Sequence, residues 1–255
     1  MRYLLLFIIS ILITLASISQ KQTSKMDIES LKKYSYLVSG DTNLINAVGH
    51  AQGTGFFIER SNRIFFVTSK HTLSGCNNGN IKDERYPDIM NINLNNDVIP
   101  INTTPIKDSA KCLPMVLDPD VIAHPLNKKE IKKSSINVIN KYEGKKPEKS
   151  QEIVLWGFPN SSDRIDSFVS NDFVILTSLD VTLDGKSFFK DEIHYCITVN
   201  DKRIDESMVG FSGSGVFLRD SNSGKFVFIG VLCGTHIPAN GLYVVQPKYL
   251  YDLLK

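Results

Sequence analysis

The chain has 255 residues, of which 42% are hydrophobic and 22% are charged, and its formal net charge at pH 7 is +2. This balance is typical of a globular protein, so a disordered chain and a polyanion-binding chain are both disfavoured, and nucleic acid is not an expected partner. The length is sufficient for one large all-β domain or for two smaller ones.

Residues 1–20, MRYLLLFIISILITLASISQ, have the three-part layout of a secretory signal. One cation, Arg2, precedes an apolar run that begins at Leu4, and small residues at 16–19 stand before an expected cleavage near Gln20. The alternative is an uncleaved membrane anchor, although the run is shorter than the roughly 20 residues that a spanning helix needs. Both interpretations predict a secreted or periplasmic protein, which in the second case is tethered to the membrane.

Most of the remaining chain consists of short β-branched and aromatic runs separated by turn residues. GTGFFIERSNRIFFVTS predicts two strands, 55–59 and 64–68, joined by a polar turn at 61–63. Further strand-like runs are MNINLNN, DVIPIN, EIVLWGF, DFVILTSL, HYCITV, GVFLR, KFVFIGVL and GLYVVQ. Helical patterns are confined to the two ends, MDIESLKKYSY and PKYLYDLLK. The sequence therefore predicts an all-β fold, either an antiparallel barrel or a sandwich.

A lysine-rich segment, residues 127–150, interrupts the strand pattern. It is a basic patch for an anionic surface or a solvated connector between two subdomains, and we favour the connector. We therefore predict an N-terminal half at 27–126 and a C-terminal half at 151–255.

The four cysteines fall two in each half, Cys76 and Cys112 in the first and Cys196 and Cys233 in the second. Because an exported protein keeps its disulfides, pairing within halves is the simplest of the three connectivities. Alternatively, Cys196 and Cys233 are small buried hydrophobes, since both stand in apolar strand-like runs. No Cys or His spacing indicates a zinc site, and no metal is expected.

A serine between glycines precedes the strand-like run GVFLR, in MVGFSGSGVFL. A catalytic serine needs a base within hydrogen-bond reach, a group that orients this base, and donors for the oxyanion. Gly210 and Gly213 would let backbone N–H groups around Ser212 approach a substrate carbonyl. By itself, the motif is equally compatible with a glycine-rich hairpin that has no chemistry.

His71 is the strongest candidate for the base among the five histidines. It follows the apolar strand of FFVTSKHTL directly, where a loop would present its ring at the strand end. His124 and His194 lie inside strand-like runs, and His50 and His236 adjoin no recognisable motif.

Three segments resemble trypsin-like, chymotrypsin-fold serine peptidases. GTGFFI with IFFVTSKHTL resembles the opening hairpin and histidine loop of this family, DPDVIAHPL its aspartate strand, and MVGFSGSGVF its nucleophile segment. Matches in the order His, Asp, Ser are more specific than any one motif. With IVLWGFP, FIGVLCG and a C-terminal helix, the resemblance covers about residues 45–255. It implies two six-stranded-type antiparallel β-barrels and a short C-terminal helix.

The resemblance implies a serine endopeptidase that acts on a protein or peptide substrate without a cofactor. Ser212 would attack the scissile carbonyl, His71 would accept its proton, and Asp120 would orient the imidazole. The N–H groups of Gly210 and Ser212 would form the oxyanion hole. Asp118 competes with Asp120, which we prefer because the apolar spacing after it fits the family.

Substitutions in the nucleophile segment motivate an alternative function, a non-catalytic trypsin-like binding or scaffold protein. Gly215 replaces the usual proline, and Phe211 stands where digestive members carry an aspartate that pairs with a new N-terminus. Activation by that ion pair is therefore not expected. Ser214 is a second hydroxyl, but as nucleophile it would not fit the Gly-x-Ser-Gly spacing.

Substrate preference depends on residues that the resemblance places at a specificity pocket. Glu206, six residues before Ser212, is either the base of this pocket, which would favour Lys or Arg, or an exposed loop glutamate, which we consider the better interpretation. Cys233 and Gly234 are expected to border the pocket.

Overall fold

The structure, a computed structural model, describes residues 10, 27–42, 49–74, 76–77, 80–81, 87–94, 97–105, 119–127, 131, 136–140, 145–158, 172–182, 193–199, 208, 210–236 and 240–254. The chain forms two compact units, Met1–Lys33 and Tyr34–Lys255. Apart from Ser10, the predicted signal or anchor at 1–20 lies outside the described residues and stays a prediction. In the parts of the chain that the structure describes, no helix has the length and apolar character needed to cross a membrane.

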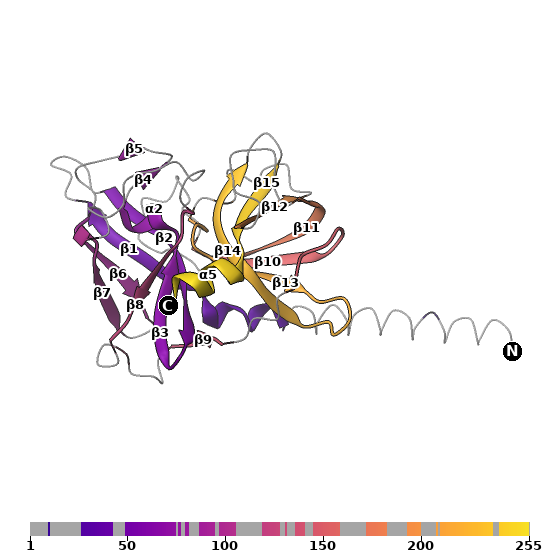
Figure 1. Ribbon diagram of the computed structural model, residues 1–255, viewed down its shortest axis with the longest axis horizontal. Coiled ribbons are helices and arrows are strands. Elements are labelled where there is room, and N and C mark those ends of the chain that lie inside the picture. The colour runs from indigo at the N-terminus through magenta and orange to yellow at the C-terminus, as the bar shows by residue number, and fades with distance from the viewer. Residues whose placement is uncertain are drawn as a thin grey trace, which may run out of the picture. The chain divides into compact units, whose positions relative to one another are not determined.

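All described strands belong to the second unit (Figure 1). The elements are η1 (Lys32–Tyr34), β1 (Tyr36–Thr42), β2 (Gly49–Arg60), β3 (Arg63–Thr68), α2 (Lys70–Ser74), β4 (Cys76–Asn77), β5 (Asn80–Ile81), β6 (Ile89–Asn93), β7 (Val98–Asn102), β8 (Ile122–Pro125), β9 (Val138–Ile139), β10 (Glu152–Gly157), β11 (Asp172–Thr182), β12 (His194–Val199), β13 (Gly215–Arg219), β14 (Phe226–His236), β15 (Gly241–Val245) and α5 (Pro247–Leu253).

The first half is a curled sheet in the strand order β7-β6-β1-β2-β3-β8, and β9 pairs with β2 beside this path. The predicted hairpin is confirmed: β2 and β3 are antiparallel, with Arg60 paired to Arg63. Ser61 and Asn62 both have positive φ, 51° and 60°, as in the two-residue turns whose twist matches that of the strands.

Alternating burial builds the core of this half. On β6 and β7 every second residue is buried, so Met90, Ile92, Ile99 and Ile101 face inward while the residues between them face outward. In the centre, the ring of Phe57 lies edge-on to Phe66 and to Tyr36. The three rings form part of one buried cluster around β2.

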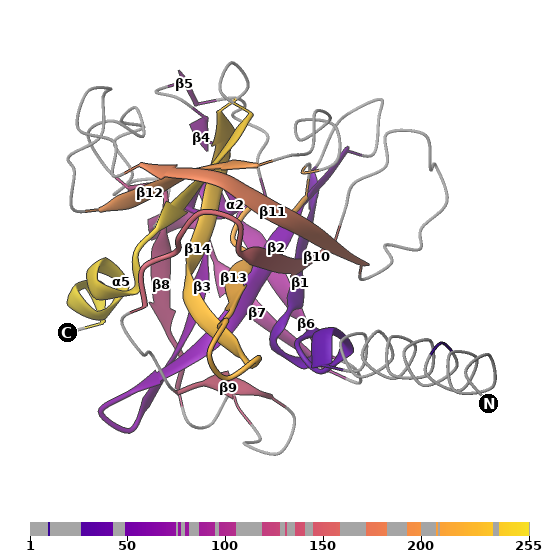
Figure 2. The same ribbon diagram turned by 90° about the vertical axis from the view of Figure 1, so that its right-hand side faces the viewer.

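The second half is a closed antiparallel barrel of six strands, in the order β10-β11-β12-β15-β14-β13. Its strands run from pink through orange to yellow in Figure 2, and α5 follows β15 at the C-terminal end. α5 packs against β14, and Pro247 opens this helix as expected at a first turn. The predicted all-β fold, with two barrel-like halves and a C-terminal helix, is confirmed. As domain limits, 27–126 and 151–255 stay predictions.

The lysine-rich segment requires a correction. Within it, β9 pairs in parallel with β2, and Ile136 and Ile139 are only 8% and 6% exposed. The apolar residues of SSINVIN bury their side chains against the first sheet, because β-branched residues suit a pleated, half-buried surface. The interpretation of 127–150 as a solvated connector is therefore wrong at these residues.

The predicted pairing of Cys196 with Cys233 is also wrong, because both are buried and neither belongs to a disulfide. Cys196 on β12 pairs with Tyr243 on β15, and Tyr243 pairs in turn with Gly234 on β14. Strands two apart in a sheet are separated by about 9 to 10 Å, whereas a disulfide needs Cα atoms within about 7 Å. Both cysteines instead fit the alternative interpretation from the sequence, that each is a small buried hydrophobic residue. Cys112 lies outside the described residues, so its pairing with Cys76 stays a prediction.

The N-terminal helical pattern ends earlier than predicted. Its described part contains one helical turn at 27–29 and η1, and Tyr36 already begins β1. Tyr36 and Val38 are buried and YLV pairs with β2, so this tertiary pairing overrides the local helical pattern.

Asp220 organises the turn between β13 and β14. Its carboxylate accepts the N–H groups of Asn222 and Ser223 at 3.3 and 3.2 Å and the Ser223 hydroxyl at 2.7 Å. It also forms an ion pair with Lys145, which comes from the lysine-rich segment. The Lys145 ammonium, followed by the Ser223 hydroxyl, holds the pKa of Asp220 well below its ordinary range.

We expect Asp220→Asn to reduce stability near neutral pH and to make stability less dependent on pH. The depressed pKa means that the carboxylate stabilises the fold above the ordinary carboxyl pKa, and that this contribution is lost as the pH falls toward the folded-state pKa. Urea denaturation from about pH 7 to about pH 3 should therefore show the wild type and the variant converging at low pH. Lys145→Gln should give part of the same loss, and parallel pH curves for wild type and Asp220→Asn would contradict the prediction.

Candidate active site

His71 lies on α2, a single helical turn directly after β3. The loop that we expected there is thus a short helix. Ser69 precedes it, and its backbone carbonyl accepts the Thr72 N–H at 3.2 Å while the two hydroxyls lie 2.7 Å apart. The Ser74 hydroxyl donates to the Lys70 carbonyl at 2.9 Å. These bonds connect residues on either side of His71 and so fix its backbone in a tight turn.

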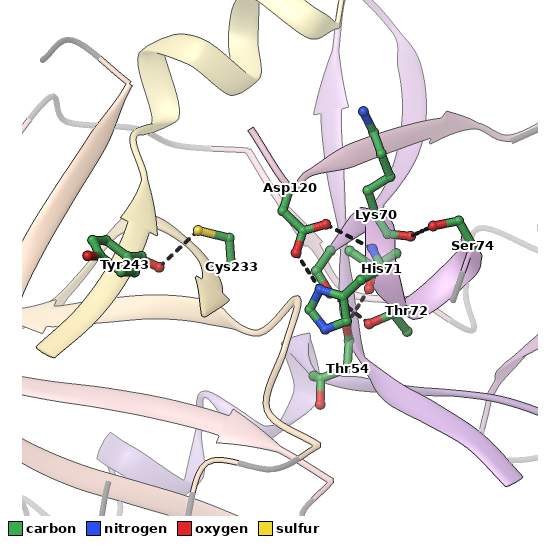
Figure 3. Close-up of polar contacts among 10 residues, drawn as sticks. Thr54, Lys70, His71, Thr72, Ser74, Asp120, Cys233 and Tyr243 are labelled. Carbon is green, nitrogen blue, oxygen red and sulfur yellow. Dashed lines mark hydrogen bonds and ion pairs between the residues drawn. The ribbon is translucent and has the colours of Figure 1, made fainter. Parts of the chain in front are cut away.

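Asp120 binds His71 through both carboxylate oxygens (Figure 3). One oxygen accepts the His71 backbone N–H at 2.8 Å, and the other contacts ring Nδ1. The Asp120 side chain is 9% exposed, whereas that of His71 is 30% exposed. Because the carboxylate contacts Nδ1, the neutral imidazole carries its proton on Nδ1. The lone pair of Nε2 is then available to accept a proton from another group.

Strand register explains how this pair forms. β3 and β8 are antiparallel, with Thr68 paired to Ile122. His71 follows the end of β3, and Asp120 precedes the start of β8, so both leave the sheet at the same edge. A backbone hydrogen bond from the Lys70 N–H to the Asp120 carbonyl, 3.2 Å, closes this edge.

Ser212 lies on a turn that enters β13, between two glycines with positive φ, Gly210 at 90° and Gly213 at 88°. Other residues of the turn donate their N–H groups within the protein: Phe211 to Met208 at 3.1 Å, Gly213 to Leu232 at 2.8 Å and Ser214 to Phe211 at 2.9 Å. Among the described residues, no hydrogen bond uses the N–H groups of Gly210 and Ser212. These are the two donors that the resemblance assigns to an oxyanion hole.

The Ser212 turn packs against the strand end that precedes His71. The Ser212 carbonyl accepts the Thr54 N–H at 3.0 Å. A Cβ on Gly213 would lie 2.1 Å from the Thr54 carbonyl oxygen and 2.8 Å from the Ser69 nitrogen. The bonds of the described residues do not include the Ser212 hydroxyl, so the structure joins Asp120 to His71 directly but does not join Ser212 to His71.

The competing candidates differ in accessibility. Ser214 is fully buried, and its hydroxyl has no hydrogen-bond partner, whereas Ser212 is partly exposed. Only Ser212 is therefore open to a substrate. Asp118 and Glu206 lie outside the described residues, so the proposed roles of both stay predictions.

Phe211 is 1% exposed and packs against the first strand of the second barrel. A Cβ on Gly157 would lie only 2.6 Å from the Phe211 ring and 2.9 Å from the Ser214 hydroxyl oxygen. The Phe211 ring thus fills the space between the Ser212 turn and Gly157 at the end of β10.

Cys233 is 1% exposed, and its thiol donates to the Tyr243 carbonyl at 3.2 Å (Figure 3). Burial, with a smaller effect of the negative charge on Asp120, raises the pKa of this thiol. The side chain therefore stays neutral near pH 7, and the place of Cys233 at a specificity pocket stays a prediction. Gly234 is partly exposed, and its place at a specificity pocket stays a prediction.

Thr54 is the residue of this region that the sequence did not single out. It is fully buried on β2, and it bonds to both the Ser212 turn and the end of β3. The local signal for this role is the threonine between two glycines in GTGF. Close approach of another backbone explains the glycines, whereas a buried hydroxyl requires a hydrogen-bond partner of its own.

No protein-family model and no curated protein matches this chain. Solved structures do match it. The Rv3671c protease from M. tuberculosis, in its active form, is 16% identical over 89% of this chain and 82% of that chain, with a TM-score of 0.49. The thermostable serine protease AL20 from an extremophilic microorganism is 14% identical over 84% and 91%, with a TM-score of 0.51. GrC is 12% identical over 88% and 92%, with a TM-score of 0.54.

At these identities the similarity concerns the fold. Together with the closed second barrel, the curled first sheet and the C-terminal helix, it shows that the chain has the chymotrypsin-like, double-barrel fold of trypsin-like serine peptidases.

Proposed function

We propose that this protein is a serine endopeptidase that hydrolyses peptide bonds in protein or peptide substrates. The observation that carries the proposal is the buried Asp120 carboxylate, which engages both the backbone and Nδ1 of His71 at the strand ends against which the Ser212 turn packs. A carboxylate that orients an imidazole beside a serine turn is the arrangement that nucleophilic acyl transfer requires. The shared fold with solved serine proteases supports the same chemistry.

In the proposed mechanism, Ser212 Oγ attacks the scissile carbonyl carbon while His71 Nε2 accepts the hydroxyl proton. We expect the contact between Ser212 Oγ and His71 Nε2 to form with substrate bound, because such contacts often tighten only then. The N–H groups of Gly210 and Ser212 would stabilise the oxyanion, each donor contributing on the order of 100- to 1000-fold in rate. The imidazolium would then protonate the leaving amine, and water would hydrolyse the acyl-enzyme by the same steps in reverse.

Export belongs to this proposal and rests on the charged start, apolar run and small residues of positions 1–20. Protein recovered outside the cytoplasm should have the mass of a chain that lacks this segment. Full-length protein in the membrane fraction would indicate a tether instead.

We expect Ser212→Ala to abolish covalent labelling by a fluorophosphonate probe, because the probe phosphonylates an activated serine, with loss of fluoride. Ser214→Ala is the matched control: it removes a hydroxyl two residues away that is buried and unpaired, so labelling should persist. In-gel fluorescence of the folded proteins measures both. A folded wild type that does not label would favour the non-catalytic binding or scaffold function.

Asp120→Asn should lower kcat by about 10⁴-fold while the fold is retained, because an amide at Nδ1 favours the wrong imidazole tautomer. The competing carboxylate provides the control, since Asp118→Asn should leave kcat nearly unchanged. Steady-state kinetics on a peptide substrate separate the two candidates, and the opposite ranking would move the orienting role to Asp118.

Gly213→Ala should eliminate labelling and destabilise the fold, because the added Cβ would lie 2.1 Å from the Thr54 carbonyl oxygen at a φ of +88°. Gly224→Ala is the matched control, with a φ of +68° and no atom within 4 Å of the added Cβ. It should cost only the backbone strain, about 1 to 2 kcal/mol, and keep activity. Urea denaturation and probe labelling of both variants test this difference, and equal effects would contradict the packing argument.

A further inference from the structure

Apart from the β1–β2 ladder, the fully buried Thr54 makes four hydrogen bonds with described residues. Its N–H donates to the Ser212 carbonyl at 3.0 Å, and its hydroxyl donates to the Gly210 carbonyl at 2.8 Å. The same hydroxyl oxygen accepts the Phe158 N–H at 3.1 Å. The Thr54 carbonyl accepts the Thr68 hydroxyl at 2.7 Å. Thr54 therefore connects β2 to the end of β3, to the residue after β10 and to the Ser212 turn.

The two carbonyls that Thr54 binds lie on either side of one peptide group. This peptide joins Phe211 to Ser212 and carries the Ser212 N–H, one of the two donors that no described acceptor uses. With the Gly210 and Ser212 carbonyls held, the peptide between them is held in its orientation. The carbonyl of this peptide also accepts the Ser214 N–H within the turn. Gly210 has a φ of 90°, and glycine passes readily between backbone conformations, so the bonds from Thr54 add a restraint from outside the turn.

From this geometry we propose that Thr54 is a positioning residue, which keeps the Ser212 N–H group aligned as a donor of the oxyanion hole. The inference rests on the proposed function. Thr54 touches neither substrate nor reacting atoms in this role; it acts through the turn.

The hydroxyl of Thr54 is required, because only a group that both donates and accepts can serve Gly210 and Phe158 together. Valine has the same shape but would leave the Gly210 carbonyl and the Phe158 N–H without this partner. Serine keeps both bonds. The Thr54 N–H bond to Ser212 is a backbone bond, which either substitution leaves in place.

The test compares Thr54→Val and Thr54→Ser with Thr103→Val in the full-length protein. Thr103 is also fully buried and donates its hydroxyl to a backbone carbonyl, that of Pro87, but it bonds to no part of the Ser212 turn. Thr103→Val therefore measures what the loss of a buried threonine hydroxyl does to the fold alone.

We expect Thr54→Val to lower kcat by about 100-fold with KM within about twofold, because the loss concerns a donor used in the transition state. Thr54→Ser should recover kcat to within a few-fold of wild type, and Thr103→Val should leave both constants unchanged. Folded Thr54→Val with wild-type kcat, or Thr54→Ser as impaired as Thr54→Val, would overturn the proposal.

Amide hydrogen exchange of the 208–216 segment separates this inference from the proposed function. Thr54→Val should speed exchange in that segment, and Thr103→Val should not. A folded wild type without labelling or turnover would defeat the proposed function, and the role of Thr54 in catalysis with it, even where exchange shows that Thr54 holds the turn. An active wild type with unchanged exchange in Thr54→Val would defeat this inference alone.

Discussion

The site depends on a contact between two backbones that leaves no room for a side chain. β2 of the first sheet passes the turn that leads into β13 of the second barrel, and the Thr54 carbonyl lies 2.1 Å from where Gly213 would carry a Cβ. Thr54 also donates hydrogen bonds to the carbonyls of Gly210 and Ser212 at this contact between β2 and the turn. Such close approach gives the turn a position set by the neighbouring barrel, whereas a glycine-rich segment by itself would sample many conformations.

The proposed triad is therefore assembled by two kinds of contact. His71 and Asp120, 49 residues apart, meet because β3 and β8 are paired neighbours within one sheet. Ser212 belongs to the other barrel and is positioned by backbone contacts between β2 and its own turn. The first contact follows from strand register, and the second requires both halves to be folded and packed.

Prediction from sequence succeeded where the signal is local. Period-two burial and turn residues predicted the β2–β3 hairpin, and the residues after an apolar strand drew attention to His71. The role of Thr54 is not local, because its partners Gly210 and Phe158 are 156 and 104 residues away. The same holds for β9, whose few apolar residues are surrounded by lysines, and for Cys196 and Cys233, whose separation depends on β15 lying between their strands. In each case a long-range partner decides the outcome, and no local pattern identifies that partner.

Phe211 shows how this chain can order its turn without an ion pair. In digestive relatives of this fold, the resemblance places an aspartate at this position that requires a newly cut N-terminus. Here the ring is 1% exposed beneath the turn and against Gly157. Burial of a phenylalanine contributes roughly 1.5 to 3 kcal/mol and is complete once the second barrel has folded. Because the buried ring needs no new charge, the order of the turn does not depend on a newly cut N-terminus.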